Sequence, residues 1–362
     1  MLESCVDGSG RSAHDCVCDT INLKYAENLK IVKHQGFTEV TLNDPWNKGK
    51  VLHKYILIPD NIEKPSNHPE GTVIRTPIKR AVIASSVHCG LIISFGKGNC
   101  IKGVCEPNFI NIPFIKDEVS KGTIADCGSG ITPTLEKIID IDADAIIISP
   151  FQNNGGYGRL NEWGNPIIEA AEYMETSALG RAEWMRFYGM LFGAEKQADE
   201  LFLSVERNYN KLKKTAQMSK TRKSVIMDKI DGSVWYVPGG QSTIGRIIAD
   251  ANAKYSFSSN KNSGGVALPF ESVLEKAGEA DIWMFRYNSP QTATRQTLLS
   301  ENKGYSQFKA YKDCNIYGCN TNKNTFYEDT PFHPDLLLRD FIIITHPELN
   351  VLGEPRYFEK LK

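Results

Sequence analysis

Residues 128–148 read GSGITPTLEKIIDIDADAIII and predict a helix that is followed directly by a buried strand. Thr132 is a favourable helix cap and Pro133 suits the first helical position, while Glu136 lies near the positive end of the helix dipole. The apolar centre at 145–148 is typical of a strand whose two faces are both covered by helices. We therefore expect this region to belong to a parallel α/β sheet.

The same alternation of strands and helices surrounds this stretch in the first half of the chain. Short segments rich in β-branched and apolar residues, bounded by turn residues, predict the strands. The segments that we expect to form the rest of this unit are strands at 80–84, 101–104 and 167–168, a helix that follows 85–88 and runs to 95, and a marginal edge sheet at 29–41 and 53–59.

A second α/β unit is predicted in the last third of the chain, after a basic loop at 220–223. A chain of 362 residues is also long enough for two units. A proline at position 347 is expected to stop the final helix. The predicted elements are strands at 224–228, 233–237, 282–286 and 316–318, and helices at 244–252, 272–277 and 334–345.

Residues 177–214 predict one long helix between the two units, with a broad apolar face and a highly charged second part. It would span roughly 55 Å at about 1.5 Å per residue, which is long for the interior of a lobe. No heptad repeat persists along it, so a coiled coil is not indicated. The predicted divisions are a flexible leader (1–25), an N-terminal lobe (26–176), a connecting helix (177–215) and a C-terminal lobe (216–362).

The composition is that of an ordinary soluble globular chain, with 41% hydrophobic and 23% charged residues. A formal net charge of -1 supplies no global positive field that would recruit nucleic acid. The longest apolar runs, such as 145–148 and 341–344, are far too short to span a bilayer. Residues 1–19 lack the apolar core of a secretory signal, so the chain is either cytosolic or a trimmed form of an exported protein.

The nine cysteines identify neither a compartment nor a metal site. An odd number cannot pair completely within one chain, and no CxxC pair of the zinc-binding type occurs. Cys314 and Cys319 close a short loop, and the sequence leaves open whether they form a disulfide. We predict no metal centre and no cofactor.

Polar and aromatic residues that follow predicted strands are the candidates for ligand binding, because ligands of open α/β sheets lie beyond the carboxyl ends of the strands. Arginines there would donate paired hydrogen bonds to anionic oxygens, and aromatic rings would supply flat apolar area with polar tips. The alternative is that the aromatic side chains only pack the rim of each sheet. The candidates are Ser86, His88, Tyr157, Arg159, Trp235, Tyr236, Gly240, Arg286 and Tyr287.

His88 is the one histidine in a position to coordinate iron or cobalt, although a histidine after an apolar strand is more often a hydrogen-bonded structural residue. The other histidines share no ligand spacing, which weakens the hypothesis of a receptor for bare zinc or manganese ions. They are His14, His34, His53, His68, His333 and His346.

Four parts of the chain carry a resemblance to a known family. Residues 128–148 contain a glycine turn, a helix with the pattern pxLEKI and an apolar strand, and 270–274 with 280–282 repeat this pattern. Residues 178–198 resemble a lobe-connecting helix, and 332–348 resemble a terminal helix with its HPE end. In this order and spacing, the chain resembles the type III periplasmic binding proteins for iron–siderophore complexes, haem and vitamin B12.

The resemblance implies two Rossmann-like α/β lobes that are joined by a single long helix, with the ligand cleft between the lobes. It also implies a monomeric, non-enzymatic receptor of an ABC importer, located in the periplasm or lipid-anchored outside the cytoplasmic membrane. In such receptors a surface glutamate of each lobe docks onto the membrane permease, and Glu136 and Glu271 are the matching positions here. For an isolated glutamate, a solvated helix carboxylate is the commoner explanation.

The cleft segments favour a bulky metal chelate with anionic oxygens over a bare cation, which would need several close ligands. Arg159 and Arg286 would pair with the oxygens, and Trp235, Tyr236 and Tyr287 would pack against the chelator. We therefore rank a ferric siderophore first, a corrinoid second and haem third.

Two alternatives use the same scaffold. The first is a tetrapyrrole metal chelatase, in which His88 and Glu175 are the natural candidates for the acid–base residues. The second is a cytosolic chelate sensor, which an upstream export signal in the full gene would exclude. No GxSxG, Walker, HExxH or GxGxxG motif supports another enzyme class.

Overall fold

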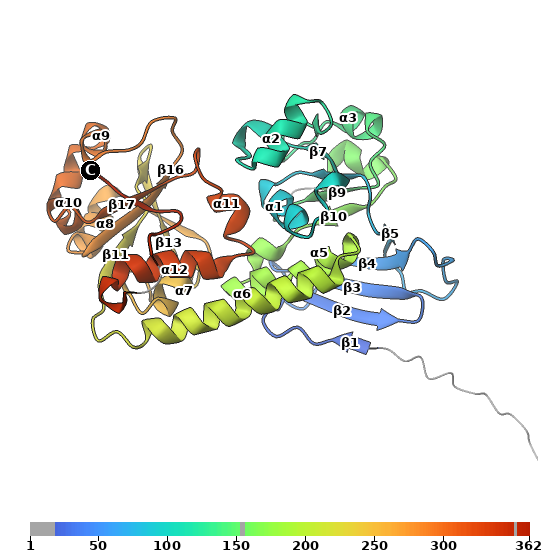
Figure 1. The fold of residues 1–362 in the computed structure, drawn as a ribbon, viewed down its shortest axis with the longest axis horizontal. Coiled ribbons are helices and arrows are strands. Elements are labelled where there is room, and N and C mark those ends of the chain that lie inside the picture. The colour runs from blue at the N-terminus through green and yellow to red at the C-terminus, as the bar shows by residue number, and fades with distance from the viewer. Residues whose placement is uncertain (1–18, 153–155, 351–352) are drawn as a thin grey trace, which may run out of the picture.

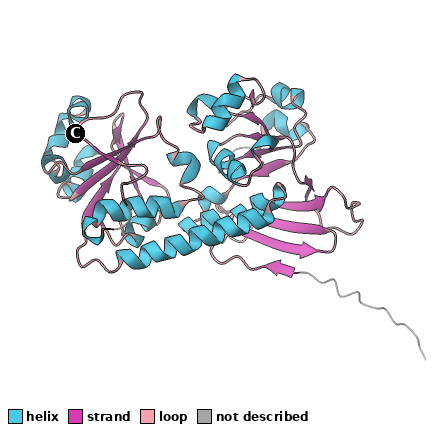
Figure 2. Ribbon diagram, viewed as in Figure 1, coloured by secondary structure: helices cyan, strands magenta, loops and turns pink. Residues whose placement is uncertain are grey.

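The computed structural model describes residues 19–152, 156–350 and 353–362 and contains two α/β lobes that lie side by side (Figure 1). A long helix, α6 (Glu195–Ala216), runs along one side of both lobes and joins them. In each lobe, helices pack around a central sheet (Figure 2). This arrangement confirms the predicted fold class of two α/β lobes with a connecting helix.

The N-terminal lobe is built on a five-stranded sheet of order β10-β9-β6-β7-β8, in which every neighbouring pair is parallel. All four residues of β9 are buried, as its apolar sequence predicts for a strand with both faces covered. The strands are β6 (Ala81–Ile83), β7 (Ile101–Val104), β8 (Ala125–Asp126), β9 (Ala145–Ile148) and β10 (Ile167–Glu169), and the helices are α1 (Ser86–Ser94), α2 (Pro113–Ser120) and α3 (Leu135–Asp140).

A second, mostly antiparallel sheet precedes this lobe and is larger than the marginal edge sheet that the sequence predicted. Its order is β1-β2-β3-β4-β5, with only the β4–β5 pair parallel. Tyr55 connects it to β10, because its hydroxyl accepts from the Glu169 amide at 2.8 Å and donates to the Ile167 carbonyl at 3.1 Å. The strands are β1 (Asp19–Ile21), β2 (Leu29–His34), β3 (Phe37–Asn43), β4 (Val51–Pro59) and β5 (Thr72–Thr76).

Two buried carboxylates hold the start of the described chain against the first lobe. Glu183 accepts hydrogen bonds from the amides of residues 24, 25 and 26 at 2.7–2.9 Å. Glu175 accepts from the amides of residues 27 and 28 at 2.9–3.0 Å. The predicted flexible leader therefore includes ordered residues from position 19 onward, while its residues 1–18 lie outside the described part of the chain.

The C-terminal lobe repeats the architecture, with a sheet of order β14-β11-β16-β17-β18 in which only β18 is antiparallel. A small antiparallel sheet of order β12-β13-β15 packs beside it. The strands are β11 (Ser224–Met227), β12 (Ile230–Asp231), β13 (Val234–Pro238), β14 (Lys254–Tyr255), β15 (Gly265–Leu268), β16 (Ile282–Tyr287), β17 (Ile316–Asn320) and β18 (Glu359–Lys360). The helices are α7 (Thr243–Asp250), α8 (Phe270–Ala277), α9 (Arg295–Glu301), α10 (Lys309–Lys312), α11 (Phe326–Asp329) and α12 (Pro334–Thr345).

The connecting segment is three helices rather than the single helix predicted for 177–214. They are α4 (Ala178–Glu183), α5 (Met185–Leu191) and α6. The chain turns between α5 and α6 at Gly193, which has a φ of 59° that glycine adopts without strain. Only α6, with 22 residues, is the long helix between the lobes, and it packs against α5 and α12.

The lobes meet where the segment before α12 reaches back to the N-terminal lobe. α11 packs against α1. Asn111 donates through its side chain to the Thr321 carbonyl at 2.6 Å, and its backbone amide donates to Glu328 at 2.8 Å.

The short loop between Cys314 and Cys319 is not closed by a disulfide, because both residues are free thiols in the structure.

Candidate functional site

Two adjoining depressions lie over the carboxyl ends of the N-terminal sheet, the position that an α/β fold predicts for a ligand. The smaller, of about 280 Å³, lies over the ends of β6, β7 and β9. The larger, of about 610 Å³, continues from it toward the start of α3. Ile131, Ser149 and Phe151 line both, so the two form one continuous surface.

Exposed apolar side chains surround the smaller depression. Phe109 is 68% exposed, Ile131 69% and Phe151 47%. Three large apolar groups exposed at one site are unusual on a soluble protein and are typical of a surface that covers a ligand or a partner. The predicted ligand-binding residues did not include these three, because Phe109 ends a one-turn 3₁₀ helix and Ile131 and Phe151 follow no periodic pattern.

Glu106 lies in the same depression, immediately beyond Cys105 at the end of β7. Its backbone has a φ of 51°, in the left-handed region that non-glycine residues seldom adopt. Its carboxylate lies over Gly130, so close that a Cβ placed on that glycine would be 3.2 Å from Oε2. The loop after β7 therefore holds a carboxylate against the floor of the depression.

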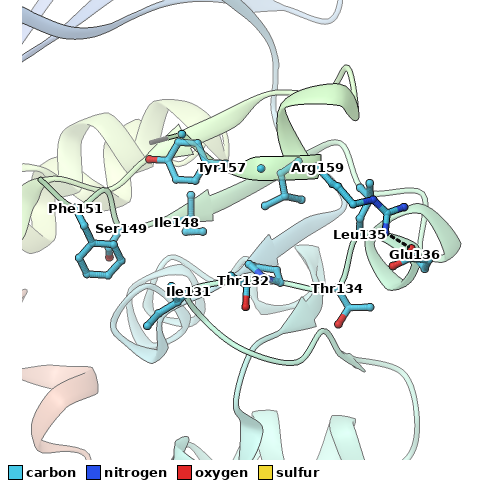
Figure 3. A pocket seen from close by; sticks show the side chains of 14 residues that line it. Ile131, Thr132, Thr134, Leu135, Glu136, Ile148, Ser149, Phe151, Tyr157 and Arg159 are labelled. Carbon is cyan, nitrogen blue, oxygen red and sulfur yellow. Dashed lines mark hydrogen bonds and ion pairs between the residues drawn. The ribbon is translucent and has the colours of Figure 1, made fainter. Parts of the chain in front are cut away.

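The larger depression contains two of the predicted ligand-binding residues, Tyr157 and Arg159, together with the predicted docking residue Glu136. Arg159 donates to Glu136 at 2.7 Å, so two residues to which we assigned different roles form an ion pair. Figure 3 shows this pair at one end of the depression and Phe151 at the other. Tyr157 donates through its hydroxyl to Glu169 at 2.8 Å. A hydrogen bond to its own amide, and then Arg159, hold the pKa of Glu136 below its usual value.

A third, small depression of about 150 Å³ lies between the lobes. Val87 of α1 lines it from one lobe, and Tyr327 of α11 and Arg286 of β16 line it from the other. Ser86, the predicted ligand-binding residue next to Val87, lines the smaller depression described above. The first turn of α1 therefore separates the two.

Arg286 does not present an unpaired guanidinium to this space. It forms two parallel hydrogen bonds to Asp228 at the end of β11, at 2.9 Å and 2.6 Å. Such forked pairs are among the strongest that arginine makes, so Asp228 satisfies the side chain within the lobe.

His88 is buried, with 1% of its surface exposed, and this corrects its assignment as a ligand-binding residue. Its Nε2 lies 3.4 Å from Glu172, and its ring packs against Tyr188 and Phe332. Burial by itself would raise the pKa of Glu172, but the charges of His88 and Arg181 and the Tyr188 hydroxyl lower it to about 2. His88 thus belongs to a buried polar cluster at the contact between the lobes.

Trp235 also lies in the interior, which corrects its assignment as a ligand contact. Its Nε1 donates to the Met227 carbonyl at 2.9 Å, and its ring packs against Trp283. Gly240 is needed for close packing, because a Cβ there would lie 2.1 Å from the Ser258 carbonyl oxygen.

The remaining predicted ligand contacts in the C-terminal lobe, Tyr236 and Tyr287, line none of these three depressions. Tyr236 lies exposed on β13. The hydroxyl of Tyr287 accepts a hydrogen bond from the Ala293 amide at 2.9 Å.

The two predicted docking glutamates occupy equivalent positions. Glu136 is in the first turn of α3, and Glu271 is in the first turn of α8. Both side chains are exposed. A carboxylate at this position is favoured by the helix dipole, and it is also accessible to a partner.

The two residues named for a chelatase have structural contacts instead. Glu175 is buried and accepts from Trp184 Nε1 at 2.9 Å, in addition to the two backbone amides of the N-terminal segment. In the described ranges, no three His, Cys, Asp or Glu side chains are grouped as a metal site would require. Nor does any described helix combine the length and apolar character that crossing a membrane requires.

Comparisons with known proteins agree with the fold. The chain is 26% identical over 352 residues to an uncharacterized lipoprotein of Methanocaldococcus jannaschii, covering 90% of this chain and 82% of that protein. A haem-binding periplasmic protein of Pseudomonas aeruginosa superposes with a TM-score of 0.60 at 13% identity, covering 79% of this chain and 98% of that chain. A siderophore-binding protein of Vibrio cholerae, solved with Fe³⁺–Desferal bound, has a TM-score of 0.54 at 12% identity, covering 75% and 100%.

The family described as periplasmic binding protein matches residues 102–322, more than half of the chain. The matched residues run from β7 to β17 and thus include α6 and parts of both lobes. The members of this family bind substrates rather than transform them, which confirms the prediction that the chain is not an enzyme. On the extent of this match and on the two-lobed fold, the chain belongs to the periplasmic binding protein family.

Proposed function

We propose that this protein is the extracytoplasmic receptor of an ABC importer and that it binds a metal chelate, with a ferric siderophore as the first candidate. The observation that carries the proposal is the apolar-rimmed depression over the carboxyl ends of β6, β7 and β9. This surface lies next to the contact between the lobes, since Asn111 follows directly after Ile110 in its wall. A chelate seated there would lie within reach of the C-terminal lobe.

The chemistry of the depression suits a wrapped metal better than a bare one. Phe109, Ile131 and Phe151 supply apolar contact area for an organic chelator. A bare divalent or ferric ion would need several oxygen, nitrogen or sulfur ligands at close range. A corrinoid remains the second candidate and haem the third, and the known haem- and siderophore-binding proteins with this fold support the ligand class.

Delivery to the membrane is the second part of the proposal. Glu136 and Glu271 are proposed to dock onto basic residues of a permease, one from each lobe. The lipoprotein relative supports a lipid-anchored location outside the cytoplasmic membrane. The protein is proposed to act as a monomer.

Native mass spectrometry with a panel of ligands tests the proposed ligand class. We expect a one-to-one complex with a ferric siderophore when the protein is incubated with ferric siderophores, cobalamin, haem and free zinc or manganese. Phe109→Ala with Phe151→Ala should weaken binding by about a hundredfold or more, because each of the two rings contributes about 1.5–3 kcal/mol when buried.

Phe114→Ala is the matched control. It removes an exposed phenylalanine of the same lobe that lines neither depression of the N-terminal sheet. Its chelate affinity should equal that of the wild type. Binding of free zinc or manganese with no chelate would contradict the proposal, and equal losses in the control and the double variant would exclude this surface as the site.

A further inference from the structure

The arginines that line the three depressions are all paired with carboxylates of this chain. Arg159 pairs with Glu136 at 2.7 Å and Arg286 with Asp228 at 2.6 Å. The third is Arg181, whose Nη2 lies 3.7 Å from Glu172. No lysine lines any of the three in the described part of the chain. Each positive charge near the proposed ligand is therefore already balanced.

Glu106 differs from the other charged residues that line these surfaces, because its carboxylate is not paired within the described residues. No hydrogen bond or ion pair involves its carboxylate among residues 19–152, 156–350 and 353–362. It is also the one charged residue lining the smaller depression within the described residues. The neighbouring walls are apolar or carry only hydroxyl and thiol groups, such as Ser85, Ser86 and Cys105.

This distribution of charge indicates which net charge the ligand carries. An anionic chelate would lose its hydration on entering the apolar depression and would meet a carboxylate instead of a cation. To gain a positive partner it would have to break one of the three ion pairs. A neutral chelate incurs neither cost, and a cationic chelate gains the attraction of Glu106.

We infer that the ligand is a neutral or singly positive metal chelate with an apolar periphery, and that Glu106 is the residue that selects against anionic chelates. The inference rests on the proposed function and narrows it. It reverses the expectation from the sequence that Arg159 and Arg286 receive anionic oxygens, because the fold pairs both with carboxylates. Hydroxamate-type ferric complexes have the required charge, whereas tris-catecholate complexes are strongly negative.

The test is a calorimetric titration of the full chain with three ferric complexes of different charge. The probes are ferric Desferal, which is singly positive, a neutral ferric trihydroxamate, and a triply negative ferric tris-catecholate. We expect the wild type to bind the first two at least about tenfold more tightly than the third. Glu106→Gln should weaken ferric Desferal about three- to tenfold, leave the neutral complex unchanged and strengthen the tris-catecholate.

Asp140→Asn makes the same change of charge at the end of α3, outside the three depressions, and should leave all three affinities at the wild-type values. If the tris-catecholate binds most tightly, or if Glu106→Gln changes all three affinities alike, the inference is wrong while the receptor function stands. If none of the three ferric complexes binds and haem, which is anionic through its two propionates, does bind, the siderophore assignment fails and with it this inference. Raised salt should weaken ferric Desferal binding to the wild type and have no such effect on the variant.

Discussion

At the scale of single residues, a buried polar cluster lies near the contact between the lobes. It consists of His88, Glu172, Arg181 and Tyr188. Tyr188 donates to Glu172 at 2.8 Å, while His88 and Arg181 approach the same carboxylate. Phe332 from the C-terminal lobe packs against both His88 and Tyr188. A charged carboxylate is tolerated here because three polar partners surround it.

The cluster predicts a dependence of stability on pH. The pKa of Glu172 falls from an ordinary value of 4.5 to about 2 in the folded chain, so the folded state stabilises the charged form. This contribution is fully present above the unfolded pKa and is lost as the pH falls through the folded pKa. The free energy of unfolding, measured by urea denaturation, should therefore decrease between pH 4.5 and about 2.

Glu172→Gln should remove this part of the pH dependence, because the amide does not titrate, and should lower stability near neutral pH by leaving Arg181 unpaired. Glu162→Gln, at an exposed site on the same lobe, should keep the wild-type pH profile. An unchanged slope in Glu172→Gln between these pH values would show that the carboxylate does not make the contribution argued above.

At the scale of elements, α6 is the helix that we expect to limit the motion of the lobes relative to each other. Its 22 residues span roughly 33 Å at about 1.5 Å per residue, enough to contact both lobes. The helix packs on α5 beside the N-terminal lobe and on α12 in the C-terminal lobe. Gly189 allows the close approach of α5 and α6, because a Cβ there would lie 2.5 Å from that of Ala198. A helix anchored at both ends resists bending.

We therefore predict only a small rotation of the lobes when the ligand binds. Small-angle X-ray scattering with and without a ferric chelate should show a slight change in the radius of gyration. The hydrogen bonds of Asn111 to the C-terminal lobe should also limit the rotation, because they join the two lobes before any ligand binds. A large contraction on binding would mean that the helix does not limit the motion.

At the scale of the whole molecule, each of the two lobes presents one glutamate that we propose to dock onto the permease. Glu136 and Glu271 lie in the first turns of the equivalent helices α3 and α8. Arg159 pairs with Glu136 in the free protein, so a permease arginine would take its place on docking. Exposed ion pairs contribute little to folding, so this exchange costs little.

The double variant Glu136→Ala with Glu271→Ala should abolish uptake of the chelate by cells while its affinity for the chelate stays at the wild-type value. Its free energy of unfolding should change by no more than about 0.5 kcal/mol, because both side chains lie on the surface. Glu195→Ala with Glu200→Ala, two changes on α6, is the control and should transport normally. Full uptake by the Glu136 and Glu271 double variant would refute the docking assignment.

The elements with strong local signals were predictable from the sequence. The final helix at 334–345 and the strand at 101–104 have the predicted bounds. The helix and strand within 128–148 are also present, as α3 and β9, but α3 begins at Leu135, after Thr134, and not at Pro133 as predicted. Capping residues, prolines and runs of apolar residues act over a few positions, so a local pattern is enough to specify them.

Two other features depend on partners that lie far away in the sequence. Arg286 and Asp228 are 58 residues apart, and only the parallel pairing of β11 with β16 brings them together. His88 looks like a residue at a strand end, but the cluster around Glu172 and Phe332 buries it. The sequence by itself determined the two α/β lobes and their order, because hydrophobic periodicity is local. The charge of the ligand surface was decided only by the tertiary structure, because burial and ion pairing depend on contacts between distant segments.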